Sequence, residues 1–198
     1  ETTVSPARAA VISQDIKMGR PEKREIDISG ITLPGEVEDA VKKHDGKSAD
    51  RSITNYKKLL VKLDVTDSSR EQVDTRLKND YRASDIFIAY EFLYENYGLI
   101  SELDTLLKSR ASGKDWAQVF EEYEKENPEF VPRDFEPGYL ESLMDDPDIS
   151  SDDIIIADRV SQKTGKSFEE LIKLIKSGRG WKEIKDGLGI VNTREELP

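Results

Sequence analysis

The chain contains two related stretches: residues 85–109 read DIFIAYEFLYENYGLISELDTLLKS, and residues 153–177 read DIIIADRVSQKTGKSFEELIKLIKS. Aligned without a gap, they share nine of 25 positions, including Asp-Ile-x-Ile-Ala at the start and Lys-Ser at the end. A three-residue insertion then brings Trp116-x-x-Val119 into register with Trp181-x-x-Ile184. Internal similarity of this kind indicates a duplicated structural unit, and it outweighs any shorter motif in the chain.

Each copy has the apolar spacing of three short helices. In the first copy, four residues at helical intervals predict one buried stripe on a single helix: Ile86, Ala89, Leu93 and Tyr97. In the second copy, Ser150-x-x-Asp153 has the spacing of a capping box, and Gly165 is expected to end the same helix. A leucine-rich helix, a glycine turn and a third helix that opens with tryptophan complete each unit.

Helical patterns also cover the sequence before the first copy, at residues 36–44, 53–63 and 70–78, and Ser52 is a suitable cap for the second of these. The expected fold is therefore mainly α, with two tandem three-helix repeat units and a helical lead-in. In this division, residues 51–127 hold the lead-in and the first repeat. Residues 128–198 hold an acidic connector and the second repeat.

The amino-terminal residues 1–50 are expected to form an arm with a short helix. Ile26 and Ile28 alternate with polar neighbours, which is typical of a half-buried strand. Residues 11–18 are the expected partner strand of a small β-hairpin across the Gly19-Arg20-Pro21 turn. An extended arm on the helical body is the alternative.

The second copy ends in a distinctive motif, Lys176-Ser-Gly-Arg-Gly-Trp-Lys-Glu-Ile184. It resembles a helical repeat of uncharacterised, often exported proteins of Gram-positive bacteria. The resemblance covers residues 85–190, and the first copy departs from it because Lys114-Asp115 precede its tryptophan in place of Arg-Gly. The resemblance implies an all-helical bacterial module and transfers no activity and no functional residue.

Five residues near the repeated Lys-Ser pairs are the candidate partner-binding residues: Lys108, Ser109, Lys176, Ser177 and Arg179. Packing explains the shared Lys-Ser pair less well than it explains the shared Ile, Ala, Leu and Trp. A lysine near a helix C-terminus also stabilises the helix dipole, so the structural explanation stands beside the functional one.

Composition excludes several classes of protein. The 198 residues include 30 Lys and Arg against 41 Asp and Glu, which gives a net charge of −11. The absence of cysteine excludes disulfides and thiol catalysis, and the single histidine, His44, excludes multi-histidine metal sites. No apolar run approaches the roughly 20 residues that a membrane-spanning helix needs. The sequence indicates no catalytic residue, no metal ligand set and no cofactor.

The net negative charge is concentrated between residues 121 and 158, where 14 acidic residues accompany two basic ones and four prolines. This composition is typical of a connector. A calcium loop opening at Asp146 is the alternative, but its sixth and twelfth positions hold Ser151 and Ala157 where the EF-hand needs Gly and Glu. Cation binding by the connector is left open.

We expect a non-enzymatic interaction or structural module that binds a protein or peptide between its two repeats. The first alternative is a DNA-associated regulator, because residues 181–190 resemble the first helix and turn of a helix-turn-helix. Net acidity makes a nucleic-acid partner the weaker expectation. The second alternative is a hydrolase that uses a carboxylate pair, although no pair stands out.

Localisation and oligomeric state stay open at this stage. The chain opens with Glu1 rather than Met, which fits a removed signal peptide and fits trimming equally well. The cysteine-free composition and the family resemblance tilt the expectation towards a secreted or cell-surface protein.

Overall fold

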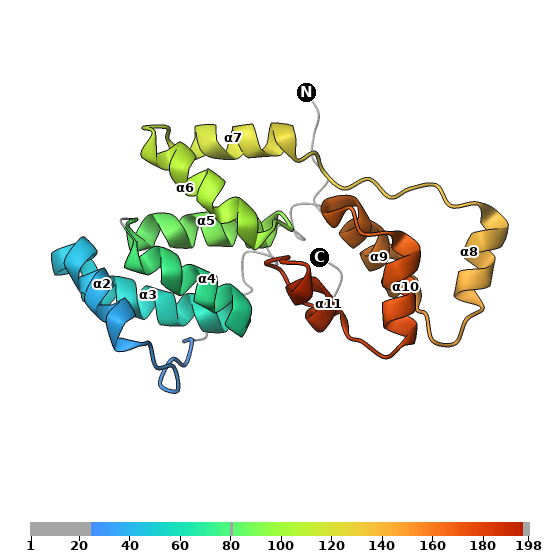
Figure 1. The fold of residues 1–198 in the computed structure, drawn as a ribbon, viewed down its shortest axis with the longest axis horizontal. Helices are drawn as coiled ribbons and strands as arrows, with labels where there is room; N and C mark the ends of the chain where they lie inside the picture. The colour runs from blue at the N-terminus through green and yellow to red at the C-terminus, as the bar shows by residue number, and fades with distance from the viewer. Residues whose placement is uncertain (1–24, 80, 196–198) are drawn as a thin grey trace, which may run out of the picture.

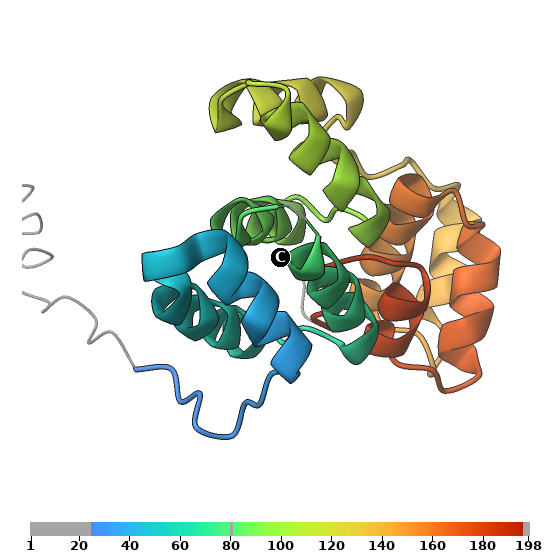
Figure 2. The ribbon, with the colours of Figure 1, turned by 60° about the vertical axis from the view of Figure 1, so that its left-hand side comes forward.

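The computed structural model describes residues 25–79 and 81–195 and confirms a mainly helical protein (Figure 1). The helices in chain order are α2 (Gly35–Asp45), α3 (Ala49–Lys62), α4 (Asp67–Lys78), α5 (Ala83–Glu95), α6 (Leu103–Ala111), α7 (Trp116–Glu126), α8 (Pro137–Met144), α9 (Ser151–Thr164), α10 (Phe168–Lys176) and α11 (Trp181–Gly187). Two short 3-10 turns, η1 (Gly46–Ser48) and η2 (Ile100–Glu102), precede α3 and α6. These helices form two bodies, α2–α7 and α8–α11, each with its own apolar core (Figures 1 and 2).

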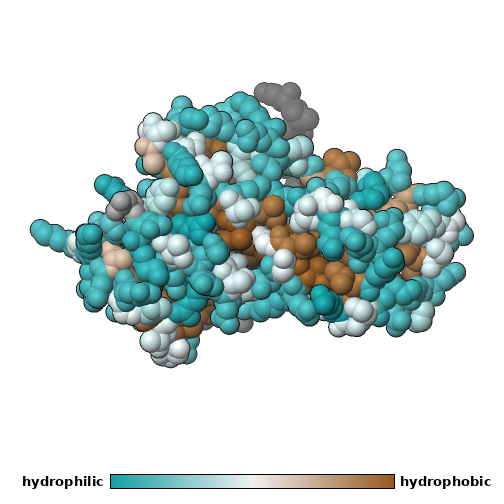
Figure 3. Space-filling view, viewed as in Figure 1, coloured by the Kyte–Doolittle hydropathy of each residue, from teal (hydrophilic) through white to brown (hydrophobic). Residues whose placement is uncertain are grey.

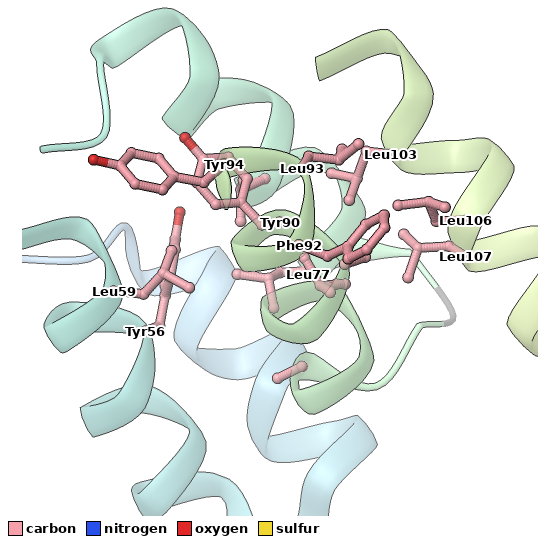
Figure 4. Close-up of a cluster of buried hydrophobic side chains, with 14 of the residues drawn as sticks. Tyr56, Leu59, Leu77, Tyr90, Phe92, Leu93, Tyr94, Leu103, Leu106 and Leu107 are labelled. Atoms are coloured by element: carbon pink, nitrogen blue, oxygen red, sulfur yellow. The ribbon is translucent and has the colours of Figure 1, made fainter. Parts of the chain in front are cut away.

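The core of the first body is built around α5, whose Ile86, Ala89 and Leu93 are fully buried. Figure 4 shows how α5 contributes to two sides of this core. On one side, Phe92 and Leu93 face three leucines of α6: Leu103, Leu106 and Leu107. On the other side, Tyr90 and Tyr94 lie near Tyr56 of α3. The first three members of the predicted apolar stripe are therefore buried in the core that α5 shares with α3 and α6.

The second body has a smaller core, and its helix α9 has clear capping residues at both ends. Ser150 and Asp153 form the expected capping box at the start of α9, with Ser150 Oγ accepting from the Asp153 N–H at 3.1 Å. Gly165 ends α9 in the left-handed conformation, at φ 74°, as predicted. Ile154, Ala157 and Val160 of this helix are buried against α10 and α11.

The long segment from Asn127 to Glu136 carries no regular secondary structure and is fastened to α9 by Arg133. The backbone N–H of Arg133 donates to the buried Asp158 carboxylate at 2.9 Å, and its guanidinium donates to the other carboxylate oxygen. The same guanidinium lies over the rings of Phe135 and Phe168. The predicted connector is thus fixed along the second body by an ion pair whose carboxylate is buried and whose arginine is exposed.

The two bodies are joined by two backbone segments that run side by side. Ile100 N–H donates to Gly189 O at 2.8 Å, and Val191 N–H donates to Gly98 O at 2.9 Å. Leu99 and Ile190 form an isolated antiparallel bridge between them. Apolar side chains gather in the middle of the face shown in Figure 3, near α11, where these bodies meet.

Each joining segment places one buried side chain in the core of the other body. Tyr97 follows α5 yet is 4% exposed within the second core, whereas Val191 follows α11 and is 2% exposed within the first. Tyr97 reaches its position because its backbone is left-handed, with φ 57°. This conformation is uncommon outside glycine and asparagine, so tertiary contacts must stabilise it.

Two local predictions are wrong. The apolar stripe of the first copy does not continue to Tyr97, because α5 ends at Glu95 and the chain turns sharply. Ser52 is not a helix cap, since α3 begins at Ala49 and Ser52 is buried within it, where its hydroxyl donates to Asp45.

The amino-terminal predictions are only partly within the described residues. Residues 25–34 contain no helix or strand, so Ile26 and Ile28 are not in a strand. The expected partner strand at residues 11–18 lies outside the described residues, so the hairpin is not confirmed, and the strand expected at Ile26 and Ile28 is absent. The short helix expected near residue 40 is α2, and its Val37 and Val41 share the core of α3–α7. Helix α2 therefore packs as part of the first body, whereas the predicted division placed residues 1–50 in a separate arm.

The turn after α5 depends on Gly98. A Cβ atom at this residue would lie 2.5 Å from Leu93 Cδ2 and 3.0 Å from Tyr123 Oη. We expect Gly98→Ala to lower the free energy of unfolding by about 1–3 kcal/mol because the core must shift to accept the methyl group. Urea denaturation measures this, with Gly35→Ala as the control because nothing lies within 4 Å of its Cβ. Equal stability of the two variants would contradict the prediction.

Candidate functional site

The five residues singled out from the sequence lie at the C-terminal ends of α6 and α10. Ser177 Oγ donates to Leu174 O at 2.6 Å, and Lys176 forms an ion pair with Asp146 of the connector. Arg179 pairs with Glu183 on the following helix at 3.6 Å. These contacts give the three residues of the second copy local structural roles.

The first copy does not repeat these contacts. Lys108 is exposed, and Ser109 Oγ lies 3.4 Å from the Glu122 carboxylate of α7. Among the described hydrogen bonds and ion pairs, none joins Lys108 or Ser109 to Lys176, Ser177 or Arg179. Because α6 and α10 belong to different bodies (Figures 1 and 2), the structure does not assemble the five residues into one site.

A groove of about 700 Å³ lies between the two bodies. Its walls come from three places: the C-terminal end of α5 with Asn96 and Tyr97, the C-terminal half of α7 with the start of the connector, and one face of α9. The α9 face contributes Arg159, Gln162 and Lys163. This groove combines residues from both bodies, and we define it as the inter-unit groove.

The floor of the inter-unit groove is aromatic and carries one arginine. The Arg159 guanidinium carbon lies 4.3 Å from the ring centre of Tyr97 and 5.8 Å from that of Phe130. Both distances are within the range of a cation–π contact. Arg159 forms no side-chain hydrogen bond or ion pair with any described residue. Its donor groups are therefore available to a molecule in the groove.

One wall of the groove is a hydrogen-bonded network that links the bodies. Lys163 of α9 donates to Glu102 at 2.8 Å, to Tyr123 Oη at 3.0 Å and to Asn127 Oδ1 at 2.9 Å. Tyr123 Oη donates to the same Glu102 carboxylate at 2.8 Å. Burial and this carboxylate raise the pKa of Tyr123, so the phenol stays protonated and keeps the network intact.

The rim of the groove is strongly acidic. Glu95 ends α5, Glu124 and Glu126 lie on α7, and Glu129 follows on the connector. All four side chains belong to exposed residues, and none forms an ion pair or side-chain hydrogen bond with another described residue. Since Glu102 neutralises Lys163, Arg159 is the remaining positive charge among these lining residues, and the rim attracts cations.

A second hollow of about 570 Å³ lies between the start of α4 and α11. Its central carboxylate, Asp186, accepts from Thr66 Oγ1 and Ser68 Oγ, both at 2.6 Å. At its edge Lys182 forms an ion pair with Asp64. These contacts fasten α11 to the first body, so the groups that a ligand would need are already used.

The described residues give little support to catalysis. No cluster of three His, Asp or Glu side chains within residues 25–79 and 81–195 is arranged to hold a metal ion. The pKa of Asp146 is lowered by the hydrogen bond from Lys176, and that of Glu122 is lowered by Lys114. A general acid needs a carboxyl pKa shifted in the opposite direction.

The helix-turn-helix resemblance also lacks its second part in the described chain. α11 ends at Gly187, and residues 188–195 form no helix. Within this segment, Gly189, Ile190 and Val191 pair with residues 98–100. Trp181, Ile184 and Lys185 of α11 are buried, so its apolar face is occupied within the protein.

Sequence reasoning missed the residues of the inter-unit groove. Arg159 and Lys163 are four residues apart on α9, opposite the apolar stripe, which is a signal that the sequence does contain. Nothing in the sequence indicates that Tyr97 and Phe130 meet Arg159, because they come from three separate segments.

Comparison with known protein families, with curated protein sequences and with solved structures finds no match for this chain. Within the part of the chain that the structure describes, no helix is both long enough and apolar enough to cross a membrane.

Proposed function

We propose that this protein is a non-enzymatic interaction module that binds a basic peptide segment of a partner protein in the inter-unit groove. The observation that carries this proposal is the groove itself, since both bodies line it and its rim presents four carboxylates without ionic partners. A segment rich in lysine and arginine complements that charge. The aromatic rings of Tyr97 and Phe130 offer an apolar surface to the uncharged side chains of such a segment.

The proposal includes a duplication, in which α5–α7 and α9–α11 are related units. Three features support it: the shared sequence falls on helices in the same order, α7 and α11 each begin at a tryptophan, and α6 and α10 each end near a Lys-Ser pair. The copies differ in the burial of their tryptophans. Trp181 is buried and donates to Asp153 at 2.8 Å, whereas Trp116 is half-buried.

The test uses a fluorescein-labelled peptide in which lysine alternates with leucine, and the same peptide with glutamate in place of lysine. The triple variant Glu124→Gln, Glu126→Gln, Glu129→Gln removes three rim charges. We expect it to bind the lysine peptide about tenfold more weakly in fluorescence anisotropy, since each rim charge contributes about 0.5 kcal/mol.

A matched control removes three exposed carboxylates elsewhere: Glu71, Glu141 and Glu169, each changed to Gln. It changes the net charge equally, so its affinity should stay within about twofold of wild type if the groove is the site. Equal weakening in both triple variants, failure of the lysine peptide to bind, or preference for the glutamate peptide would overturn the proposal.

A further inference from the structure

We propose that Arg159 is a carboxylate receptor at the floor of the inter-unit groove, and that the basic partner segment ends there in its free C-terminal carboxylate. This inference rests on the proposed function and specifies its partner. It assigns the groove a chain end rather than an internal stretch of peptide.

The first support comes from how Arg159 is presented. The guanidinium carbon of Arg159 lies over the Tyr97 ring, 4.3 Å from its centre, and this contact restricts the position of the side chain. Its N–H donors have no acceptor among the described residues, so they are left for a ligand. Two parallel N–H groups match the two oxygens of a carboxylate, which is the pairing that this geometry favours.

The second support is a comparison within the protein. Arg133 has the same kind of aromatic setting, with Phe135 at 5.6 Å and Phe168 at 5.2 Å. Its guanidinium binds the buried Asp158 carboxylate. Arg159, which follows Asp158 on α9, also lies against aromatic rings, but its guanidinium binds no carboxylate of a described residue. The missing partner is the group that we expect a ligand to supply.

The acidic rim decides which anion fits. Glu95, Glu124, Glu126 and Glu129 repel negative charge, so a phosphate dianion meets about twice the repulsion of a single carboxylate. An acidic ligand must also carry enough positive charge to offset the rim. The C-terminus of a basic segment meets both conditions. Its peptide chain leaves the groove in one direction only, whereas the chain on either side of an internal acidic residue must pass the rim twice.

A third support is the buried Lys185, which contacts the same Tyr97 ring as Arg159. Its ammonium is 5.0 Å from the Tyr97 ring centre and donates to Arg194 O at 2.6 Å. Burial and then the charge of Arg159 lower the pKa of Lys185 to about 8, while Glu195 acts in the opposite direction. A carboxylate on Arg159 offsets that positive charge, so its binding should raise the Lys185 pKa and take up protons near pH 8.

The experiment compares one lysine–leucine peptide as the free C-terminal acid and as the C-terminal amide, by calorimetry on the whole chain. We expect the acid to bind about tenfold or more tightly, because it adds a bidentate charged contact. That direction is opposite to the effect of net charge, since the acid adds a negative charge to a ligand of an acidic protein. At pH 8 the acid alone should show proton uptake, measured in buffers of different ionisation enthalpy.

Three variants of the protein test whether Arg159 is the residue that recognises the carboxylate. Arg159→Gln should abolish the preference for the acid, and Arg159→Lys should restore only part of it because lysine lacks the bidentate fork. The control Arg51→Gln, at an exposed residue of α3, should keep the preference in full. Thermal unfolding confirms that each variant is folded.

The outcomes separate this inference from the proposed function. Equal binding of acid and amide, with rim variants still weakening both, would overturn the role of Arg159 and leave the basic-peptide groove standing. An amide peptide with an internal glutamate that matches the free acid would overturn the chain-terminus assignment. Failure of both peptides to bind would overturn the proposed function, and with it this inference.

Discussion

Trp181→Ala should lower the free energy of unfolding by about 3–5 kcal/mol, the largest loss that we expect from any single substitution in the second body. Trp181 is 4% exposed and packs in the core of α8–α11. Its indole N–H donates to Asp153 at 2.8 Å, which connects the first residue of α11 to the first turn of α9. Truncation therefore leaves a cavity and removes the contact between these two helix starts. Urea denaturation followed by circular dichroism measures the loss.

The matched control is Trp116→Ala, at the corresponding position of the first copy. Trp116 is half-buried and opens α7, and its ring lies 5.3 Å from that of Phe120 at a tilt of 30°. Because less apolar surface leaves water there, we expect a loss of about 1–2 kcal/mol. A larger loss of stability at Trp116 than at Trp181 would contradict the prediction that the more deeply buried tryptophan contributes more to folding.

Lys185→Met should stabilise the protein by about 2 kcal/mol at pH 7. Lys185 is 1% exposed, and burial is the main reason that its pKa falls from its ordinary value of 10.5 to about 8. That shift of about 2.5 units corresponds to about 3 kcal/mol of destabilisation at pH 7, at 1.36 kcal/mol per unit. Loss of the hydrogen bond to Arg194 O returns about 1 kcal/mol.

The pH dependence gives this prediction a distinct signature. Below pH 8 both folded and unfolded chains carry the protonated lysine, so the cost of burial is present in full. Between pH 8 and 10.5 the folded protein releases this proton while the unfolded chain keeps it, so wild type gains stability relative to the variant. The advantage of Lys185→Met should thus shrink over this range. A constant difference from pH 7 to 10.5, or a destabilised variant at pH 7, would contradict the prediction.

Local chemistry explains why much of the helical pattern was predictable. The start of α9 follows from Ser150 and Asp153, and its end follows from Gly165, because capping residues and a left-handed glycine act within a few residues of the chain. The apolar spacing of Ile86, Ala89 and Leu93 likewise reports one face of α5. Such signals require no knowledge of tertiary structure.

Tyr97 shows where this reasoning stops. Its spacing continues the stripe of α5, but the helix ends at Glu95 and the residue adopts φ 57° to enter the other core. Contacts with α9 and α11 compensate for that backbone strain, and no local pattern reports contacts made 60 to 90 residues away. Ser52 fails for a related reason, since the residues before it continue the helix and bury it.

The candidate site was less predictable than the fold. Repetition drew attention to Lys108, Ser109, Lys176 and Ser177, yet their contacts lie at helix ends in two separate bodies. The inter-unit groove depends instead on how the bodies are joined, which places Tyr97 and Phe130 beside Arg159. The shared residues are mostly those that build the helices and cores, whereas the groove is lined by residues that differ between the two related stretches, such as Glu95 and Lys163.

The reciprocal placement of Tyr97 and Val191 has a consequence for how the molecule opens. Tyr97 follows the first body but is buried in the core of the second, and Val191 follows the second body but is buried in the core of the first. Separation of the two bodies therefore removes a buried side chain from both cores at once. Opening of the inter-unit groove is therefore coupled to loss of the Leu99–Ile190 bridge and to exposure of apolar surface in each half. Because the amide groups of Ile100 and Val191 donate across this junction, we expect their protons to exchange slowly and only when the chain unfolds as a single cooperative unit, which native-state hydrogen exchange measures.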